Sequence, residues 1–466
     1  MEVVLRLTGK QHAQLKAHLF PGDGKEAVAV ALCGRRAGRS RHCLTVRTIV
    51  PIPYDQCAVR TPYRITWSTQ SLRPLIEEAA KRGLSVLKIH SHPGGLDGFS
   101  DFDDRSDRDL FISIHGWMDD DRPHVSAVML PDGRLFARTV GPSGEFAPVS
   151  LVSVVGDDLH FWRTPGATPE IPEFAWRHAQ IFGSGTTSML SRISLAVIGC
   201  SGTGSPVVEQ LARLGVGKLV LVDPDVVEEK NLNRILNATI EDARQRAPKV
   251  EVMKRAIARI GLHTEVLAFD RDLADPEVVK AVAECDAVFG CMDSVDGRHL
   301  LNRLAVFYLL PYFDIGVKLE ADGQGGVDQI CGTVHYLQPD GSSLLSRGTY
   351  TIEQVRVAAL KRADPDAYQD QLQSKYIVGV REERPAVISV NLLFASLGVN
   401  EFLARLHPHR DDSNRDFAIY RLSLTQARVI QDADGAPCQA LARHAGRGDV
   451  KPLLDMPALS EEEPAQ

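Results

Sequence analysis

From residue 193 onward the chain alternates short apolar runs with segments of helical spacing, and this alternation limits the folds that it can adopt. The run ISLAVIG leads into a glycine-rich turn, an amphipathic segment and a second apolar run, KLVLVDPD. Three more apolar runs follow at residues 263–269, 286–292 and 311–317. Parallel strands need long crossover connections, which intervening helices supply. The pattern therefore predicts an α/β domain with a doubly wound parallel sheet over residues 193–445.

Residues 1–148 show a different mixture, in which strands dominate and an α/β sandwich is expected. The expected elements are strands at 26–34 and 42–53, a buried strand that runs into a glycine-rich loop at 85–95, helices at 70–83 and 105–117, and a hairpin at 124–140. Residues 149–192 show no clear strand pattern and are expected to connect the two domains. The Pro- and Glu-rich residues 446–466 are expected to be a disordered tail.

Composition excludes several classes of protein. No apolar run approaches the ~20 residues that cross a bilayer, and the first residues lack the basic and apolar regions of a secretory signal. The formal net charge is −7, whereas proteins that bind nucleic-acid backbones are usually basic. The eight cysteines include no CxxC pair, which indicates free thiols in a reducing compartment. We therefore expect a cytoplasmic protein with no membrane or nucleic-acid partner.

The string HSHPGGLDGFSDFD at residues 90–103 brings together residue types that bind zinc. His90 and His92 are two positions apart on an expected strand, so both imidazoles point to the same side. The glycine-rich loop then lets the chain turn back and deliver the Asp103 carboxylate. Two histidines and one carboxylate leave a fourth position open for water, as in catalytic zinc sites. A separate base is needed, and Glu26, at the start of the first central strand, is best placed.

The same string resembles the JAMM metalloprotease motif, HxHP followed by SxxD. That family comprises zinc isopeptidases that cut after the C-terminal glycine of ubiquitin or ubiquitin-like proteins, and the resemblance covers roughly residues 1–148. It implies a set of site residues: His90, His92 and Asp103 as zinc ligands, Glu26 as general base, and Ser100 as a hydrogen-bonding group near the oxyanion. The alternatives left open are Asp101 or Asp104 as the carboxylate ligand and Glu77 or Glu78 as the base.

A second site is indicated by the glycine-rich turn after the run ISLAVIG. Gly199, Gly202 and Gly204 let the backbone approach phosphate oxygens, and the helix that follows supplies free N–H groups and the positive end of its dipole. Asp223 ends the next strand, about twenty residues on, where an acidic side chain can hydrogen bond to ribose hydroxyls. The spacing is GxxGxG rather than GxGxxG, and these residues alone leave NAD and ATP both open.

Residues farther along distinguish these cofactors. The segment VIGCSGTGS, the segment LVLVDPDVVEEKNLNR, Lys249 and the segment CMDSVDGRHLLN together resemble the adenylating domain of the ThiF/MoeB/HesA family and of ubiquitin-activating enzymes. The match covers about residues 174–440. It implies a Rossmann-like fold that uses ATP and Mg²⁺. In that family a peptide C-terminal carboxylate attacks the α-phosphate, which gives an acyl-adenylate and pyrophosphate.

The second resemblance also implies roles for individual residues. Arg234 and Lys249 would neutralise the triphosphate, and Asn231 would help to place it. Asp293, at the carboxyl end of a strand, would hold Mg²⁺. Asp225 would be a supporting residue of the nucleotide site. The segment WRHAQIFG resembles the one from which the family donates an arginine across a dimer, here Arg177, which implies a homodimer through this domain.

The chain departs from the family pattern in two places. Ser201 stands where a glycine is usual, and nucleotide binding is expected to survive this small change. Many relatives bind a structural zinc through two CxxC pairs, but Ser343 and Ser346 stand where one pair would fall, so no zinc is expected in this half. No cysteine stands out as an acceptor of the activated carboxylate. Residues 375–406 are expected to form a strand or loop followed by a helix.

Together the two resemblances indicate a fusion of a JAMM-type peptidase with an adenylating domain. The peptidase would trim or release the C-terminal tail of a ubiquitin-like protein, and the second half would activate the exposed glycine carboxylate. By resemblance, such systems act in bacterial antiphage defence, with a conjugating enzyme as a further partner. The alternatives are activation and release of a sulfur carrier in sulfur transfer, and a scaffold with one inactive half. A dehydrogenase is disfavoured because the NLNR and Lys249 features would have no role with NAD.

Overall fold

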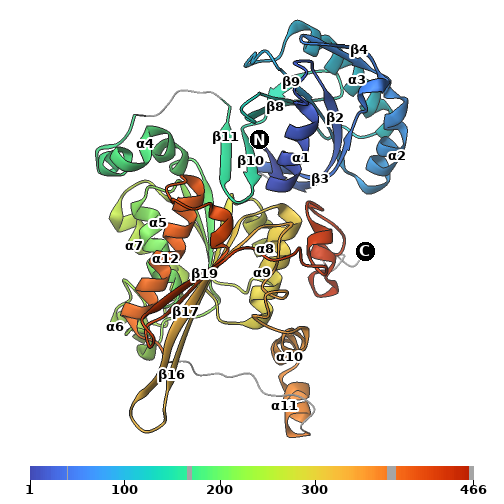
Figure 1. Ribbon diagram of the computed structural model, residues 1–466. Coiled ribbons are helices and arrows are strands. Elements are labelled where there is room, and N and C mark those ends of the chain that lie inside the picture. The colour runs from blue at the N-terminus through green and yellow to red at the C-terminus, as the bar shows by residue number, and fades with distance from the viewer. Residues whose placement is uncertain (39, 165–169, 375–384, 461–466) are drawn as a thin grey trace. The chain divides into compact units, whose positions relative to one another are not determined.

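The computed structural model describes residues 1–38, 40–164, 170–374 and 385–460, and Figure 1 labels its elements. The chain divides into two compact units. The first contains Met1–Ala167, Phe307–Leu309 and His444–Lys451, and the second contains the other residues. None of the described helices is long and apolar enough to cross a membrane.

The described part of the first unit is built on a nine-stranded sheet. In sheet order its strands are β11 (Leu159–Arg163), β10 (Leu151–Val155), β1 (Glu2–Thr8), β3 (Arg41–Pro51), β2 (Val28–Ala37), β6 (Ser85–Ser91), β7 (His124–Met129), β8 (Leu135–Val140) and β9 (Phe146–Pro148). A separate hairpin pairs β4 (Cys57–Thr61) with β5 (Arg64–Trp67). The helices are α1 (Gly9–Leu19), α2 (Arg73–Arg82) and α3 (Asp101–Met118), with short 3-10 helices η1 (Tyr54–Gln56) and η2 (Thr69–Leu72).

Each face of this sheet carries an apolar core. Alternate residues of β2 point to opposite faces, so that Ala29 lies in one core and Val30 in the other. Leu15 of α1 joins the first core, whereas Ala79 of α2 and Phe111 of α3 join the second. The first unit is therefore an α/β sandwich with α1 on one face and α2 and α3 on the other, which confirms the expected fold class.

Residues 149–192 do contain strands, contrary to the expectation from the sequence. β10 and β11 form an antiparallel pair, and β10 also lies parallel to β1. All residues of β10 are buried. Its sequence, LVSVV, is short and interrupted by a serine, so its apolar pattern is weak by itself. Pairing with β1, far away in the sequence, gives this segment its place in the sheet.

The segment that follows residue 443 is also structured, contrary to the expected disorder. Residues His444–Lys451, called the C-terminal strap below, belong to the first unit. Thr45 donates a hydrogen bond to the Gly446 carbonyl at 2.9 Å, and Arg36 pairs with Asp449 at 3.3 Å. Farther on, the 3-10 helices η7 (Leu453–Asp455) and η8 (Pro457–Leu459) bury three leucines, contacts that a disordered tail lacks. Residues 461–466, also expected to be disordered, lie outside the described residues.

In the second unit the described residues form an eight-stranded sheet. Its strands, in sheet order, are β14 (Glu265–Phe269), β13 (Lys218–Val222), β12 (Ser194–Ile198), β15 (Ala287–Gly290), β16 (Tyr312–Ala321), β17 (Val327–Leu337), β18 (Ile419–Ser423) and β19 (Arg428–Asp432). The helices are α4 (Trp176–Leu190), α5 (Gly204–Arg213), α6 (Ile240–Arg244), α7 (Lys249–Ile260), α8 (Pro276–Ala283), α9 (Val295–Tyr308), α10 (Ile352–Ala363), α11 (Pro365–Gln373) and α12 (Ile388–Leu406). Further 3-10 helices are η3 (Glu173–Ala175), η4 (Glu229–Asn231), η5 (Asn414–Phe417) and η6 (Ala442–His444). The last residues of α9 and η6 are assigned to the first unit.

The strands from β14 to β16 are parallel, which confirms the doubly wound sheet. β12 lies between β13 and β15, so the strand order reverses beside it, and ligands bind at the carboxyl ends of strands at such a point. The antiparallel strands β17 to β19, which the sequence analysis did not single out, extend the sheet, and Figure 1 shows β16 and β17 as a long hairpin. The helix expected within residues 375–406 is α12, whereas residues 375–384 lie outside the described residues.

Candidate functional site

Local sequence rules place the histidines and the carboxylate of the first site. β6 is buried along its whole length, and His90 lies near its end, with His92 directly after it. Ser100 caps α3, because its hydroxyl accepts a hydrogen bond from the Asp103 N–H at 3.2 Å while Asp103 accepts one from the Ser100 N–H at 2.8 Å. The SxxD sequence is thus a capping box that starts the helix and fixes the Asp103 side chain.

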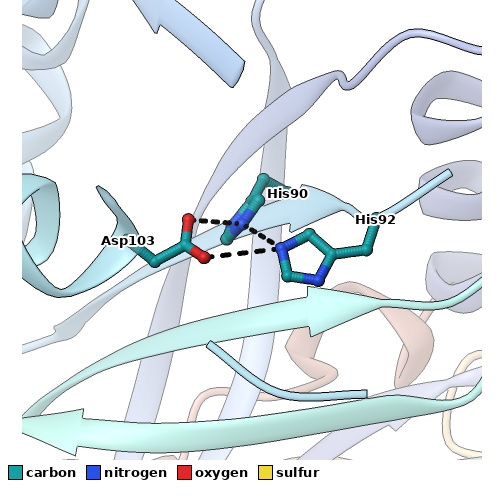
Figure 2. Close-up of side chains that lie close together, drawn as sticks. All are labelled: His90, His92 and Asp103. Carbon is teal, nitrogen blue, oxygen red and sulfur yellow. Dashed lines mark hydrogen bonds and ion pairs between the residues drawn. The ribbon is translucent and has the colours of Figure 1, made fainter. Parts of the chain in front are cut away.

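The three side chains converge on one point, as Figure 2 shows. The Nε2 atoms of His90 and His92 are 3.1 Å apart. His90 Nε2 lies 3.0 Å from Asp103 Oδ1, and His92 Nε2 lies 3.5 Å from Asp103 Oδ2. All three residues are buried. Among the described residues, this is the one group of three or more His, Cys, Asp or Glu side chains that could hold a metal ion.

The cluster fits zinc. Tetrahedral zinc with bonds of about 2.0–2.1 Å places neighbouring ligand atoms about 3.3 Å apart, close to the separations in this cluster. His92 Nδ1 lies 2.9 Å from the Leu96 carbonyl oxygen, to which it can only donate, so its Nε2 carries the lone pair that a metal needs. Two imidazole nitrogens and one carboxylate oxygen are also a donor set that zinc favours.

Glu26 lies on the same side of the sheet as the histidines. β2 pairs with β6 so that Val28 is opposite His90, which puts Glu26 level with His92 and on the same face. Its backbone N–H donates to Thr61 O at 2.9 Å, and its side chain is buried. Burial raises the pKa of Glu26 to about 7, against an opposing effect of His92. A carboxyl group with this pKa can accept and return a proton near neutral pH.

The alternatives that the sequence left open are placed differently. Asp101 is exposed, and Asp104 forms an ion pair with Arg138. Glu77 and Glu78 lie on α2, where they pair with arginines of the same helix. The Ser100 hydroxyl donates to Asp103 Oδ2 at 2.7 Å, so in this geometry it orients the carboxylate. Its expected role near an oxyanion stays a prediction.

The glycine-rich turn of the second unit lies at the carboxyl end of β12. Gly199 has a φ of +92°, which favours glycine, and its N–H donates to Val222 O at 2.8 Å. A Cβ atom on Gly204, the first residue of α5, would lie 1.7 Å from the Gly199 carbonyl oxygen. A Cβ atom on Gly202 would lie 3.0 Å from Arg234 Cδ. The turn therefore needs glycine at positions 199 and 204, and it brings the Arg234 side chain against the backbone of Gly202.

Acidic and basic side chains meet beside this turn. Asp223 is buried, accepts hydrogen bonds from the backbone N–H groups of Cys200 at 2.7 Å and Asp225 at 2.9 Å, and lies 3.6 Å from Lys249 Nζ. Burial raises the pKa of Asp223, although Lys249 opposes this. Lys249 is the first residue of α7 and pairs with Asp225 at 2.6 Å. A carboxylate has about four lone-pair positions, so Asp223 keeps capacity for a further donor.

Three other expected nucleotide residues, Asn231, Asp293 and Arg177, lie on separate parts of the second unit. Asn231 accepts a hydrogen bond from the Glu228 N–H at 3.0 Å and thereby caps η4. Asp293 is exposed beyond the end of β15. Burial opposes the charge on Arg298, but Asp314 raises the pKa of this guanidinium, with smaller effects of Tyr312 and Asp293. Arg177 lies on α4 and is exposed.

Sequence reasoning missed two features of this site. Asn391 of α12 lies against the turn, with its Nδ2 3.4 Å from Thr203 Oγ1 and 2.4 Å from the position that a Gly202 Cβ would take. A buried pair joins Arg298 to Asp314 at 3.2 Å. An asparagine in the apolar stretch VISVNLLFASLG was the available signal for the first feature.

Ser343 and Ser346, at the position where the family pattern implied a CxxC pair, bond to each other's backbone. The Ser343 N–H donates to Ser346 Oγ at 2.9 Å, and the Ser346 N–H donates to Ser343 Oγ at 3.1 Å. Among the cysteines of the second unit, Cys438 is buried and Cys331 is partly exposed.

Comparisons with known proteins match both halves of the chain. The model of the ThiF family matches residues 176–431, and the model of prokaryotic homologs of the JAB domain matches residues 9–138. The adenylyltransferase and sulfurtransferase MOCS3 of Danio rerio is 33% identical over 135 residues, which are 29% of each chain. The molybdopterin-synthase adenylyltransferase of Escherichia coli K12 is 34% identical over 128 residues, 28% of this chain and 50% of that protein.

A solved structure is also similar. The crystal structure of E. coli MccB with ATP has a TM-score of 0.43 and 18% identity, and covers 59% of this chain and 75% of that chain. The chain spans about a third or less of the length of the first curated relatives that it matches. Because the ThiF model matches more than half of the sequence, the chain belongs to the ThiF family, and its N-terminal part carries a JAB-type domain.

Proposed function

We propose that the protein is a bifunctional enzyme that processes and then activates the C-terminus of a ubiquitin-like protein. One observation carries the proposal: a single chain holds two sites whose chemistries are consecutive. A peptidase produces a C-terminal carboxylate, and an adenylating site consumes one. The cluster of His90, His92 and Asp103 supports the first activity, and the glycine turn with Lys249 supports the second.

In the first unit, His90, His92 and Asp103 would hold Zn²⁺. The ion would supply a Lewis acid and lower the pKa of a bound water. Glu26 would take up a proton at its carboxylate and deliver it to the leaving amine, for which a pKa of about 7 is suited. Ser100 would keep Asp103 oriented through the two hydrogen bonds that it donates to Oδ2.

In the second unit, the turn and the side chains around it would hold Mg-ATP. The N-terminus of α5 and the backbone of Gly202 would approach the phosphates. Arg234 and Lys249 would neutralise their charge, and Asp293 would bind Mg²⁺. Further contacts to the nucleotide would come from Asp223, Asp225 and Asn231.

A two-step assay tests the whole proposal. The full chain is given Mg-ATP, labelled pyrophosphate and the ubiquitin-like protein, either ending in glycine or carrying extra residues after it. We expect exchange of label into ATP with both forms. His90→Ala should abolish exchange with the extended form only, and Asp293→Ala should abolish it with both. Exchange with neither form would refute the adenylating function, and equal exchange by His90→Ala with the extended form would refute the peptidase function.

A mixing experiment tests the proposed homodimer and the role of Arg177. Arg177→Ala and Asp293→Ala should each be inactive in exchange. Their mixture should recover part of the activity if Arg177 is donated across a dimer, because one site of a mixed dimer is then complete. A mixture that stays inactive although mixed dimers form would show that Arg177 does not act on the partner's site.

Sulfur transfer is a second candidate, which the names of the relatives favour. One of them is named an adenylyltransferase and sulfurtransferase, and another a molybdopterin-synthase adenylyltransferase. In that case the adenylated carrier would become a thiocarboxylate rather than an amide conjugate. Mass spectrometry of the carrier after reaction with a sulfur donor or with an amine acceptor distinguishes the two functions. A thiocarboxylate would favour sulfur metabolism, and an amide conjugate would favour conjugation during antiphage defence.

A further inference from the structure

A buried ion pair lies next to the proposed zinc ligands, on the same two elements. Lys88 Nζ donates to Asp107 Oδ1 at 2.7 Å. The side chain of Lys88 is 5% exposed and that of Asp107 is 0% exposed. Neither residue belongs to the metal cluster, and neither is used by the proposed chemistry. Charges in the protein interior are costly unless they are paired, so this pair forces Lys88 and Asp107 to stay together.

The Lys88–Asp107 ion pair and the His90–Asp103 contact are two successive contacts between β6 and α3. Lys88 and His90 are two residues apart on β6 and point to the same face, about 6.7 Å apart. Asp103 and Asp107 are four residues apart on α3, about 6 Å along the helix axis. Because these two spacings nearly match, the Lys88–Asp107 ion pair holds β6 and α3 at the separation that the His90–Asp103 contact also needs.

Arg138 of β8, a third element, also contacts Asp107. Its Nη2 atom lies 2.6 Å from Asp107 Oδ2, so both oxygens of this carboxylate have a cationic partner. The guanidinium is stacked between the rings of Phe99 at 3.8 Å and Phe146 at 3.7 Å. Phe99 directly precedes Ser100, the cap of α3. Asp107 therefore cannot move without disturbing a packed cation and the start of the helix.

We propose that Lys88 and Asp107 are positioning residues that set the distance between the two histidines and Asp103. This inference rests on the proposed zinc site of the first unit. It assigns to the pair the task of preorganising the ligands for one ion, in addition to any contribution to folding. Groups that orient metal ligands from behind typically change metal affinity 10- to 100-fold when they are removed.

Zinc affinity of the full chain tests the proposal without any activity measurement. Lys88→Met and Asp107→Asn are compared with wild type by competition with a chromogenic chelator, and the absorption spectrum of the Co²⁺ form reports ligand geometry. We expect zinc affinity to fall roughly 10- to 100-fold and the Co²⁺ bands to change. Arg41→Met is the matched control, because it removes another buried cation of the first unit, paired with Glu2 at 2.9 Å. Its zinc affinity should stay that of wild type.

Folding is measured separately by circular dichroism and urea unfolding. Asp107→Asn keeps the shape of the side chain and serves if Lys88→Met does not fold. Asp107→Glu keeps the charge but lengthens the side chain, so lower zinc affinity in this variant would support a role in distance rather than charge. Folded variants that bind zinc as wild type does would overturn the inference alone. Failure of wild type to bind zinc would overturn the proposed peptidase site and the inference with it.

Discussion

Gly204→Ala should disable the adenylating half, and the geometry of the turn gives the size of the effect. A Cβ atom on Gly204 would lie 1.7 Å from the Gly199 carbonyl oxygen, so the turn would have to open. Opening breaks the hydrogen bonds from Gly199 to Val222 at 2.8 Å and from Cys200 to Asp223 at 2.7 Å. Each hydrogen bond contributes about 1 kcal/mol to stability, and overpacking costs about 1–3 kcal/mol. The free energy of unfolding of the second unit should therefore fall by roughly 3–5 kcal/mol.

Gly202→Ala is the matched control for this prediction. Its Cβ atom would meet Asn391 Nδ2 at 2.4 Å and Arg234 Cδ at 3.0 Å, which are parts of side chains that can move. We expect a loss of stability below about 1 kcal/mol but weaker pyrophosphate exchange, because Arg234 is displaced. Urea unfolding and the exchange assay measure both effects. A Gly204→Ala protein with the urea midpoint and exchange rate of wild type would refute the packing argument.

Three further predictions concern the first unit. Glu26→Gln should keep zinc by metal analysis and lose cleavage of the extended substrate; full cleavage would remove Glu26 as the base. Burial would raise the pKa of Asp107, but Lys88 and Arg138 hold this pKa below its usual value. The contribution of the charged carboxylate to the free energy of unfolding is therefore present above about pH 4 and lost at lower pH. The difference in urea stability between wild type and Asp107→Asn should therefore shrink below pH 4, and a constant difference would contradict this. Gly448→Ala should lower the free energy of unfolding by roughly 2–4 kcal/mol, because φ is +63° and the Cβ atom would lie 2.5 Å from the Arg35 backbone nitrogen. Gly116→Ala, at an exposed position of α3, is the control and should not destabilise the unit.

The features that local sequence determines could be predicted. The strand that carries His90 contains the apolar residues Val86, Leu87 and Ile89 and runs into a glycine-rich loop, and the pairing of Ser100 with Asp103 is a helix cap within four residues. The alternation of strands and helices from residue 193 fixed the type of sheet for the same reason, because each step depends on neighbouring residues. The HxHP, SxxD and NLNR patterns then indicated which chemistry those elements carry.

The features that were missed depend on contacts between distant residues. β10 is a strand because it pairs with β1, about 150 positions earlier in the sequence. Asn391 approaches the glycine turn from a helix 188 residues away. The positioning role proposed for Lys88 depends on its contact with Asp107, which exists only in the folded unit, where α3 packs against β6. Neither periodicity nor composition encodes which of many polar residues will meet in this way.

The C-terminal strap also has a consequence for synthesis on the ribosome. N-terminal domains generally fold first as the chain emerges, but the first unit includes residues His444–Lys451, with Gly448 paired to Arg35. Roughly 280 residues separate Ala167 from Lys451, which takes on the order of 15–60 s at about 5–20 residues per second. During this interval the ends of β2 and β3 lack their last partner. The JAB-type half therefore reaches its final structure only after the whole ThiF-type half has been translated.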